Sequence, residues 1–321
     1  MRRRATGRGL SFTEIGLGAA QLGNLYRETM DLEAAAAVDA AWDAGIRYFD
    51  TAPHYGLGLS ERRLGAALAT RDRDEYIIST KVGRLLVPSP ATADQWDDGG
   101  FVVPADQRRE WDFSRDGILR SLEGSLERLG LDRVDVVYLH DPDDHWEIAS
   151  TAGMSALIEL REQRVVGAIG AGMNQTAMLA EFIRRCDVDV MMLAGRFTVL
   201  EHGALDELLP LAEQREVGIV AAGVYNSGLL STPRPAADAR YDYEEAPTEL
   251  IARANAIADV CEPYGVTLPD IAVAYPLRHR AVVSVVVGTR TAEQVRSNVS
   301  RYETDIPEGL WDELDDAGLL R

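Results

Sequence analysis

The chain has 321 residues, 46% of them hydrophobic, and a formal net charge of −19. This length suits a single α/β barrel with a large buried core. The acidity argues against nucleic acid and anionic membranes as partners, because both attract basic surfaces.

Short apolar segments alternate with amphipathic helical patterns along the chain. Helical patterns cover, for example, residues 32–44, 60–69, 114–129 and 178–185. The eight apolar segments are residues 16–20, 46–50, 76–82, 134–140, 165–170, 188–193, 218–223 and 282–287. Strand–helix alternation requires a parallel sheet, and eight such units predict a closed (β/α)8 barrel. Because no linker divides the chain, we expect residues 1–321 to form one domain.

Three segments fall outside this alternation. Residues 5–13 precede the first strand and predict a small N-terminal hairpin. Residues 84–113 contain prolines, a Gly-Gly pair and aromatic residues. They are too long for an ordinary connection, so we expect a loop over the functional site. Residues 307–319 predict an extra C-terminal helix.

The cysteine spacing and the length of the apolar runs argue against a metal-binding, a disulfide-rich and a membrane protein. The two cysteines, Cys186 and Cys261, lack a metal-binding spacing, so we expect neither a metal site nor a disulfide scaffold. No apolar run has the length of a signal-peptide core or a membrane span, and we therefore expect a cytoplasmic protein that does not bind membranes.

Lys81 is the only lysine among the 33 Lys and Arg residues. It ends the apolar segment 76–82, so it is predicted to lie at the carboxyl end of a buried strand. Arginine serves as well as lysine on a solvated surface, but not where chemistry requires a compact amine on a flexible stem. We therefore predict a functional role for this amine.

Three further polar residues are predicted at the same end of the barrel. Asp50 ends the second strand, Tyr55 lies five residues later, and His140 ends the fourth strand. Each alone could be a cap, a packing residue or a rim residue. Together they describe a proton-transfer site, in which the Lys81 ammonium lowers the pKa of the Tyr55 phenol and Asp50 keeps that ammonium charged. His140 can then donate a hydrogen bond to a substrate oxygen.

These residues carry a resemblance to a known family, the aldo-keto reductases. Four separated segments agree with the family in order and spacing: residues 45–52, Tyr55-Gly56 with Ser60-Glu61, residues 79–83, and Tyr138-Leu139-His140. The resemblance runs from about residue 16 to the C-terminus. It implies hydride transfer between a nicotinamide dinucleotide and a carbonyl or alcohol substrate. It also implies that Asp50, Tyr55, Lys81 and His140 are the catalytic residues.

The resemblance places the cofactor residues after the fifth, seventh and eighth strands. The implied set is Asn174, the turn Tyr225, Asn226, Ser227, Gly228 and Leu229, and then Gly288, Thr289, Arg290, Gln294 and Asn298. Many members carry an arginine for the 2′-phosphate of NADP where this chain has Gln294, so NAD is expected. NADP stays open, because Arg290 could reach a phosphate.

Departures from the common pattern resemble a bacterial branch of sugar 1-dehydrogenases. This implies oxidation of an aldose, of the L-fucose or D-threo-aldose type, at C1 to the lactone. Aromatic faces suit a pyranose ring, and the expected pocket consists of Trp96, Phe101, Trp111, His145 and Trp146, with Asp141 and Arg196 as polar groups for the hydroxyls.

Several alternatives remain at this point. A pyridoxal 4-dehydrogenase or a general aldehyde reductase would belong to the same family. A Schiff-base aldolase that uses Lys81, or a non-catalytic regulatory protein that binds the cofactor, would not require this reaction. The sequence also leaves a homo-oligomer open.

Overall fold

A computed structural model describes residues 1–242 and 244–321 of the chain. In these residues eight parallel strands form a closed barrel, in which each strand pairs with the next along the chain and the last pairs with the first. The strands are β3 (Ile15–Gly18), β4 (Tyr48–Asp50), β5 (Ile77–Val82), β8 (Val134–His140), β9 (Val166–Met173), β10 (Val190–Ala194), β11 (Gly218–Ala222) and β14 (Val282–Gly288). The predicted (β/α)8 barrel is confirmed.

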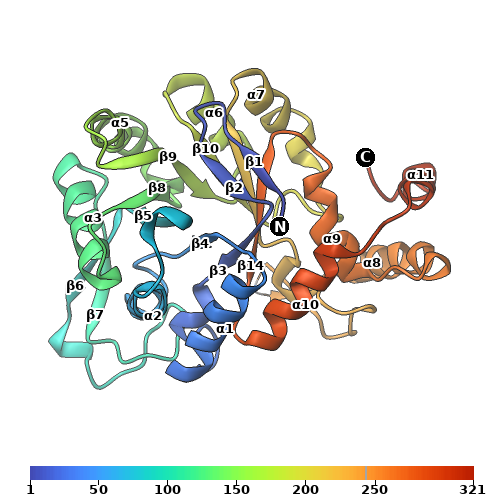
Figure 1. Cartoon of the computed structure of the whole chain (residues 1–321), viewed down its shortest axis with the longest axis horizontal. Coiled ribbons are helices and arrows are strands. Elements are labelled where there is room, and N and C mark those ends of the chain that lie inside the picture. Colours follow the sequence, from blue (N-terminus) through green and yellow to red (C-terminus); the bar gives the residue numbers. More distant parts are fainter. Residues whose placement is uncertain (243) are drawn as a thin grey trace.

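Helices surround the barrel (Figure 1). They are α1 (Asp31–Asp43), α2 (Leu59–Leu68), α3 (Arg115–Leu129), α4 (Trp146–Ile148), α5 (Met154–Glu162), α6 (Thr176–Arg185), α7 (Leu208–Gln214), α8 (Thr248–Cys261), α9 (Leu268–Leu277), α10 (Ala292–Glu303) and α11 (Glu308–Asp316). Helix α3 begins after Ser114, whose hydroxyl accepts a hydrogen bond from the amide of Gly117, and ends at Gly130 with φ at 65°. Both are regular helix-capping features. Helix α11 confirms the predicted C-terminal helix.

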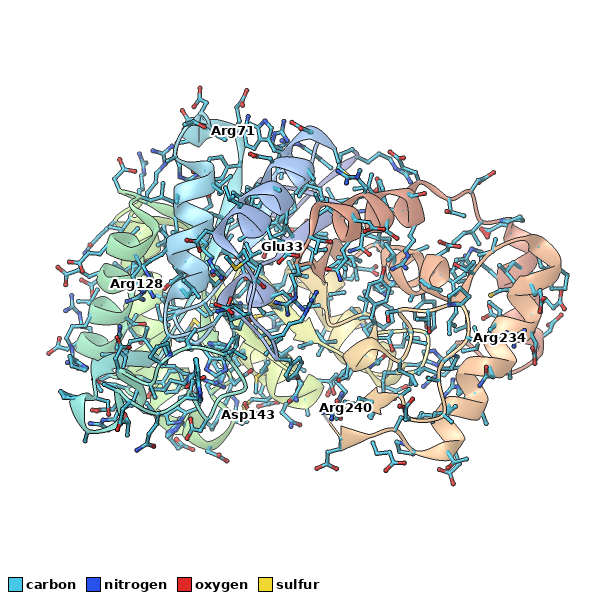
Figure 2. The ribbon with its side chains drawn as sticks, turned by 90° about the horizontal axis from the view of Figure 1, so that it is seen from below. Glu33, Arg71, Arg128, Asp143, Arg234 and Arg240 are labelled. Carbon is cyan, nitrogen blue, oxygen red and sulfur yellow. The ribbon has the colours of Figure 1, made fainter. Side chains whose placement is uncertain are left out.

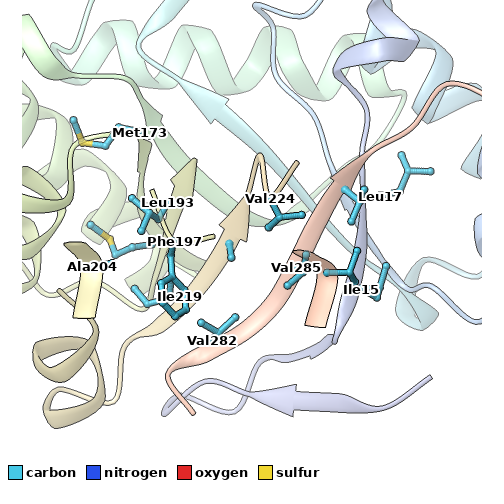
Figure 3. Close-up of a cluster of buried hydrophobic side chains, with 14 of the residues drawn as sticks. Ile15, Leu17, Met173, Leu193, Phe197, Ala204, Ile219, Val224, Val282 and Val285 are labelled. Atoms are coloured by element: carbon cyan, nitrogen blue, oxygen red, sulfur yellow. The ribbon is translucent and has the colours of Figure 1, made fainter. Parts of the chain in front are cut away.

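The two faces of each strand enter different cores. Figure 3 shows Leu17, Leu193 and Val285, which belong to the large cluster that the strands share with the surrounding helices. The side chains of Tyr48 and Tyr138 instead enter a second buried cluster, together with Phe12. This division follows from the period of two along a strand.

The N-terminal hairpin closes the amino-terminal end of the barrel. Strands β1 (Arg3–Ala5) and β2 (Ser11–Thr13) pair antiparallel, as predicted. Phe12 is fully buried, and its ring lies edge-on to Tyr48 with the ring centroids 4.7 Å apart. The carboxyl ends of the strands lie at the other end, which is therefore the open one. In Figure 2 Arg71, which precedes β5, lies at the top edge of the view, and Asp143, which follows β8, lies near the bottom edge.

Residues 84–113 are more regular than the expected loop. Strands β6 (Arg84–Pro88) and β7 (Gln107–Trp111) form an antiparallel hairpin, with Arg84 opposite Trp111. In the connection between these two strands, Phe101 forms a β-bridge with Leu25. The prolines and glycines lie mostly in the connection between β6 and β7, so they conceal the strands in the sequence. Within the described residues, no helix is long and apolar enough to cross a membrane.

Candidate active site

Lys81 lies at the centre of a buried polar cluster at the open end of the barrel. Its Nζ donates hydrogen bonds to Asp50 Oδ2 at 2.7 Å, to the carbonyl of Thr51 at 3.0 Å and to Tyr55 Oη at 3.1 Å. An ammonium has three donors, so all three are used. The predicted contacts of Lys81 with Asp50 and Tyr55 are present in the structure.

The register of the barrel brings these residues together. Asp50 is paired with Ser79 across β4 and β5, and Lys81 is paired with Tyr138 across β5 and β8. His140 is paired with Gly172 of β9. A Cβ at Gly172 would lie 3.8 Å from Lys81 Cε, so the glycine leaves open the space beside the lysine stem.

The charge state of Lys81 follows from its partners. Burial alone would lower the pKa of this ammonium, but the Asp50 carboxylate and the Tyr55 phenol outweigh burial, and the pKa is raised. The pKa of Tyr55 is also raised, because burial outweighs the nearby ammonium. We expected Lys81 to bring the phenol below its ordinary pKa. In this structure Lys81 only limits the increase that burial causes.

His140 faces the same space as Tyr55. The two ring centroids lie 5.9 Å apart, with the rings nearly perpendicular. Burial lowers the pKa of His140 well below its ordinary value, and the nearby Arg84 and Lys81 add to this effect. The imidazole is therefore neutral near pH 7 and can donate one N–H to a ligand oxygen.

A chain of hydroxyl groups connects Asp50 to the barrel interior. Ser79 Oγ donates to Asp50 Oδ1 at 2.7 Å, and the Tyr48 hydroxyl lies 3.1 Å from Ser79 Oγ. The Tyr48 and Tyr138 hydroxyls are 3.3 Å apart. Both oxygens of the Asp50 carboxylate thus have a partner. The sequence analysis did not identify these three supporting residues.

Two ion pairs that the sequence analysis missed border the cluster. Arg84, three residues after Lys81, contacts Asp141 Oδ2, which lies 3.7 Å from His140 Nε2. Arg109 of β7 binds Asp97 through both of its terminal nitrogens and donates to the carbonyl of His54 at 2.9 Å. Arg109 thereby holds the hairpin against the residue that precedes Tyr55.

Arg84 could have been suspected from the sequence, because it follows a strand end as Asp141 does. Nothing local in the sequence distinguishes Arg109. His54 was also missed. Its ring centroid lies 5.6 Å from that of His140, and burial, with help from Arg109, lowers its pKa to about 2.

The predicted aromatic wall is only partly assembled. Phe101 is buried, and its ring centroid lies 6.1 Å from that of Tyr55. Trp111 lies beneath the Arg84 guanidinium, 4.2 Å from its Cζ, and His145 packs on Trp111 at 5.1 Å between ring centroids. These residues are near the mouth of the site, as expected.

Three predicted pocket residues have other surroundings. Trp96 has 69% of its surface exposed. Trp146 packs against Phe182 of α6, with the ring centroids 4.8 Å apart, and belongs to the edge of the helix-side core. Arg196 forms a two-nitrogen ion pair with Asp242. The partners of Trp146 and Arg196 are distant in the sequence, so the sequence does not reveal these contacts.

Polar atoms without partners mark the region where a cofactor was expected. Among the described residues, Asn226 Oδ1, Thr289 Oγ1 and Gln21 Oε1 are buried and have no hydrogen-bond partner in the protein. Gly288 directly precedes Thr289 and is exposed. A Cβ at Gly288 would come within 2.6 Å of Gln21 Nε2, so Gln21 lies directly against this glycine. Unpartnered buried oxygens beside an exposed glycine fit a polar ligand such as a dinucleotide.

The other residues expected to contact the cofactor lie in the turn after β11, directly after β9 and at the start of α10. Tyr225, in front of the turn Asn226–Gly228, donates to Asn298 Oδ1 at 2.8 Å and accepts from Arg301. In this turn Ser227 and Gly228 have positive φ angles, and Leu229 is buried behind them. Asn174 is exposed directly after β9. The amino terminus of α10, capped by Thr291, adds the positive end of a helix dipole.

Arg290 is not available as the sequence suggested. Its guanidinium is buried, donates to the backbone carbonyls of Leu25 and Arg27, and contacts the hydroxyl of Thr29. The Gln294 side chain accepts from the Arg290 amide at 2.8 Å. A swing of Arg290 toward a phosphate would break all of the guanidinium contacts.

Comparison with known proteins agrees with this geometry. Residues 14–318 match the model of the aldo/keto reductase family. A barrel that brings Asp50, Tyr55, Lys81 and His140 together at its carboxyl end is the arrangement that the resemblance implied. The chain belongs to the aldo/keto reductase family and is an oxidoreductase of the NAD(P)-dependent type.

Particular relatives narrow the comparison. The chain is 48% identical to D-threo-aldose 1-dehydrogenase of a Pseudomonas species, over 98% of this chain and 97% of that protein. It is 39% identical to pyridoxal 4-dehydrogenase of Microbacterium luteolum, over 99% and 98% of the two chains. The holo form of an aldo-keto reductase from Bacillus halodurans superposes with a TM-score of 0.78 at 25% identity, over 100% of this chain and 97% of that one.

Within the described residues, no group of three or more His, Cys, Asp or Glu side chains could hold a metal ion.

Proposed function

We propose that this protein is an NAD(P)-dependent dehydrogenase that oxidises an aldose at C1 to the corresponding lactone. The observation that carries the proposal is the contact of 3.1 Å between Lys81 Nζ and Tyr55 Oη at the open end of the barrel. The greater identity to D-threo-aldose 1-dehydrogenase than to pyridoxal 4-dehydrogenase supports a sugar as the substrate.

Each residue of the cluster has a distinct role in this proposal. Oxidation removes a hydride from C1 and a proton from the hydroxyl on C1. Tyr55 accepts the proton, and Lys81 stabilises the phenolate form of Tyr55 electrostatically. Asp50 holds the Lys81 ammonium in place, and the neutral His140 donates a hydrogen bond to the substrate oxygen. Nicotinamide, when bound, is the hydride acceptor.

We further propose NAD as the preferred cofactor. Asn174, Asn226, Thr289 and the turn at Ser227 and Gly228 would hold it beside the exposed Gly288. The position where many family members bind a 2′-phosphate has Gln294, whose side chain is neutral. A phosphate dianion needs a nearby cation, and the Arg290 guanidinium is engaged with residues 25–29.

Oxidation of pyridoxal is the second candidate, because a relative with that name is 39% identical and Phe101 offers an aromatic face. General aldehyde reduction would use the same cluster in reverse. A Schiff-base aldolase is disfavoured, since the Lys81 ammonium uses all three donors and has a raised pKa. A purely regulatory role would leave the assembled cluster without a use.

A substrate panel tests the proposal. The purified protein is incubated with L-fucose, D-arabinose, D-galactose, pyridoxal and a simple aldehyde, each with NAD and with NADP, and the reduced cofactor is followed by absorbance. Turnover of an aldose with a kcat/KM well above that of pyridoxal supports the proposal. Turnover of pyridoxal alone would replace it with the second candidate.

A further inference from the structure

The Arg84–Asp141 pair lies directly beside the residues that handle the reacting oxygen. Asp141 follows His140 in the chain, and Asp141 Oδ2 is 3.7 Å from His140 Nε2. Its backbone amide donates to the carbonyl of Gly172 at 2.9 Å, and its φ is 40°. Asp141 thus has a fixed backbone at the edge of the site.

Arg84 positions this carboxylate from the other side. The guanidinium lies over the Trp111 ring, with Cζ 4.2 Å from the ring centroid, and Nη2 contacts the Asp141 carboxylate. Only 14% of the Arg84 side chain is exposed, against 40% for Asp141. A carboxylate accepts several hydrogen bonds. Asp141 therefore keeps exposed acceptor capacity after Arg84 has taken its share.

The charges around the mouth favour an uncharged ligand. Lys81 is paired with Asp50, Arg84 with Asp141 and Arg109 with Asp97. Each of these cations is balanced by a carboxylate, so this part of the site offers a phosphorylated or carboxylated substrate no unpaired positive charge. A polyol suits it better, because each hydroxyl can donate to a carboxylate and accept from a guanidinium.

We propose that Asp141, held by Arg84, accepts a hydrogen bond from the substrate hydroxyl next to the reacting carbon, the C2 hydroxyl of an aldose. This inference rests on the proposed function. The reacting oxygen is held by Tyr55 and His140, and the oxygen of a vicinal hydroxyl lies within hydrogen-bond reach of it. The carboxylate beside His140 Nε2 is therefore in the region where that second oxygen falls. Asp141 and Arg84 are then specificity-determining residues for 2-hydroxy aldehydes and sugars.

The test compares D-arabinose with 2-deoxy-D-ribose, which differ only in the C2 hydroxyl. A site that hydrogen-bonds a substrate hydroxyl rejects the analogue without it strongly. We therefore expect the wild type to favour D-arabinose in kcat/KM by at least about 100-fold. D-arabinose 5-phosphate serves as an additional probe, and we expect it to be a poorer substrate than D-arabinose.

Two variants assign the discrimination to the pair. Asp141→Gly removes the carboxylate at a positive φ that glycine adopts without strain, and it should reduce the preference for D-arabinose to within about threefold. Arg84→Met keeps an apolar stem on Trp111 and should reduce the preference by about tenfold. Asp144→Asn, on the exposed part of the same turn, is the matched control and should leave the preference unchanged.

The outcomes separate the inference from the function on which it rests. If Asp141→Gly lowers kcat/KM equally for both sugars, Asp141 acts only through His140 or the fold, and the inference is wrong. It is also wrong if the wild type does not distinguish the two sugars, although aldose oxidation would then still stand. If no aldose is oxidised but pyridoxal is, the proposed function itself fails.

Discussion

Ser79 Oγ donates a hydrogen bond of 2.7 Å to Asp50 Oδ1, while Lys81 binds the other oxygen of the same carboxylate. Ser79 is fully buried and its hydroxyl is also within 3.1 Å of the Tyr48 hydroxyl. Because Ser79 donates to Asp50, Tyr48 donates to Ser79. The hydroxyl dipoles then point one way, toward the carboxylate, and such chains strengthen their members.

This relationship predicts the effect of Ser79→Ala on stability. A hydrogen bond to a charged group contributes about 1.5–3 kcal/mol, against about 0.5–1.5 kcal/mol for a neutral one. Ser284, also fully buried in a barrel strand, donates to the backbone carbonyl of Thr13 at 2.8 Å and provides the matched neutral case. We expect Ser79→Ala to lower the free energy of unfolding more than Ser284→Ala in urea titrations. An equal loss would mean that Ser79 contributes only an ordinary hydrogen bond.

The phenol is tested with Tyr55→Phe. This variant keeps the ring beside Phe101 and His140 but removes the group that exchanges the proton. General acid–base catalysis contributes about 10²- to 10⁴-fold, so kcat should fall by that factor, while binding of the cofactor, followed by fluorescence titration, stays near that of the wild type. Tyr264→Phe, with an exposed ring, should keep full activity. Near-normal turnover by Tyr55→Phe would eliminate the proposed role.

Lys81→Arg separates charge from shape. Arginine keeps the positive charge, but its planar guanidinium cannot direct three bonds from one nitrogen to Asp50, Thr51 and Tyr55. We expect this variant to be nearly as inactive as Lys81→Met in steady-state assays.

Lys81→Met has an additional consequence, because it leaves Asp50 buried without its cation. Such a loss costs about 3–5 kcal/mol, which urea denaturation can measure. If Lys81→Arg retained most of the activity, the argument from the single lysine would be refuted, whatever the fate of the methionine variant.

The cofactor preference follows from Gln294 and Arg290. We expect kcat/KM to favour NAD over NADP by at least about tenfold, or roughly 1.4 kcal/mol. Gln294→Arg should narrow the ratio, chiefly through a lower KM for NADP. Arg290→Ala should lower the melting temperature, because the guanidinium holds residues 25–29, without changing the ratio. A wild type that prefers NADP and loses this preference in Arg290→Ala would show that Arg290 leaves its buried position.

The pH dependence follows from the shifted groups. Oxidation needs Tyr55 as a proton acceptor, and the pKa of Tyr55 is raised. The kcat/KM for oxidation should therefore rise with pH across the neutral range and continue to rise in alkali. Because burial keeps His140 neutral, no inflection near its ordinary pKa of about 6.5 is expected. Lys81→Met should move any residual activity to still higher pH. A plateau below pH 7 would contradict the raised pKa of the phenol.

The sequence was most informative where a short pattern determines a position. Strand ends defined by apolar runs located Asp50, Lys81 and His140, since the ends of parallel strands meet at one edge. The expected plug hairpin and the C-terminal helix also followed from local patterns. The hydroxyl contacts inside the barrel were harder to predict, because the sequence does not show which cross-strand hydroxyl a buried serine or tyrosine will contact.

Side chains outside the barrel strands were the least predictable. Trp146 and Arg196 were expected in the pocket, but each has a strong partner elsewhere, Phe182 and Asp242. Arg109, in turn, acts on the site from a hairpin that composition alone presented as a loop. Such pairings depend on long-range contacts, which sequence periodicity does not encode.

The β6–β7 hairpin leaves the barrel at Arg84 and returns at Trp111, and these two residues face each other in its register. An insertion that is closed at its own base can be lengthened, shortened or exchanged without displacing Lys81 before it or α3 after it. Residues of this hairpin that border the site, such as Phe101, can thus differ while the barrel strands keep Asp50, Lys81 and His140 in place. Because Arg84 lies at the base of the β6–β7 hairpin, it stays beside Asp141 when the connection between the two strands changes.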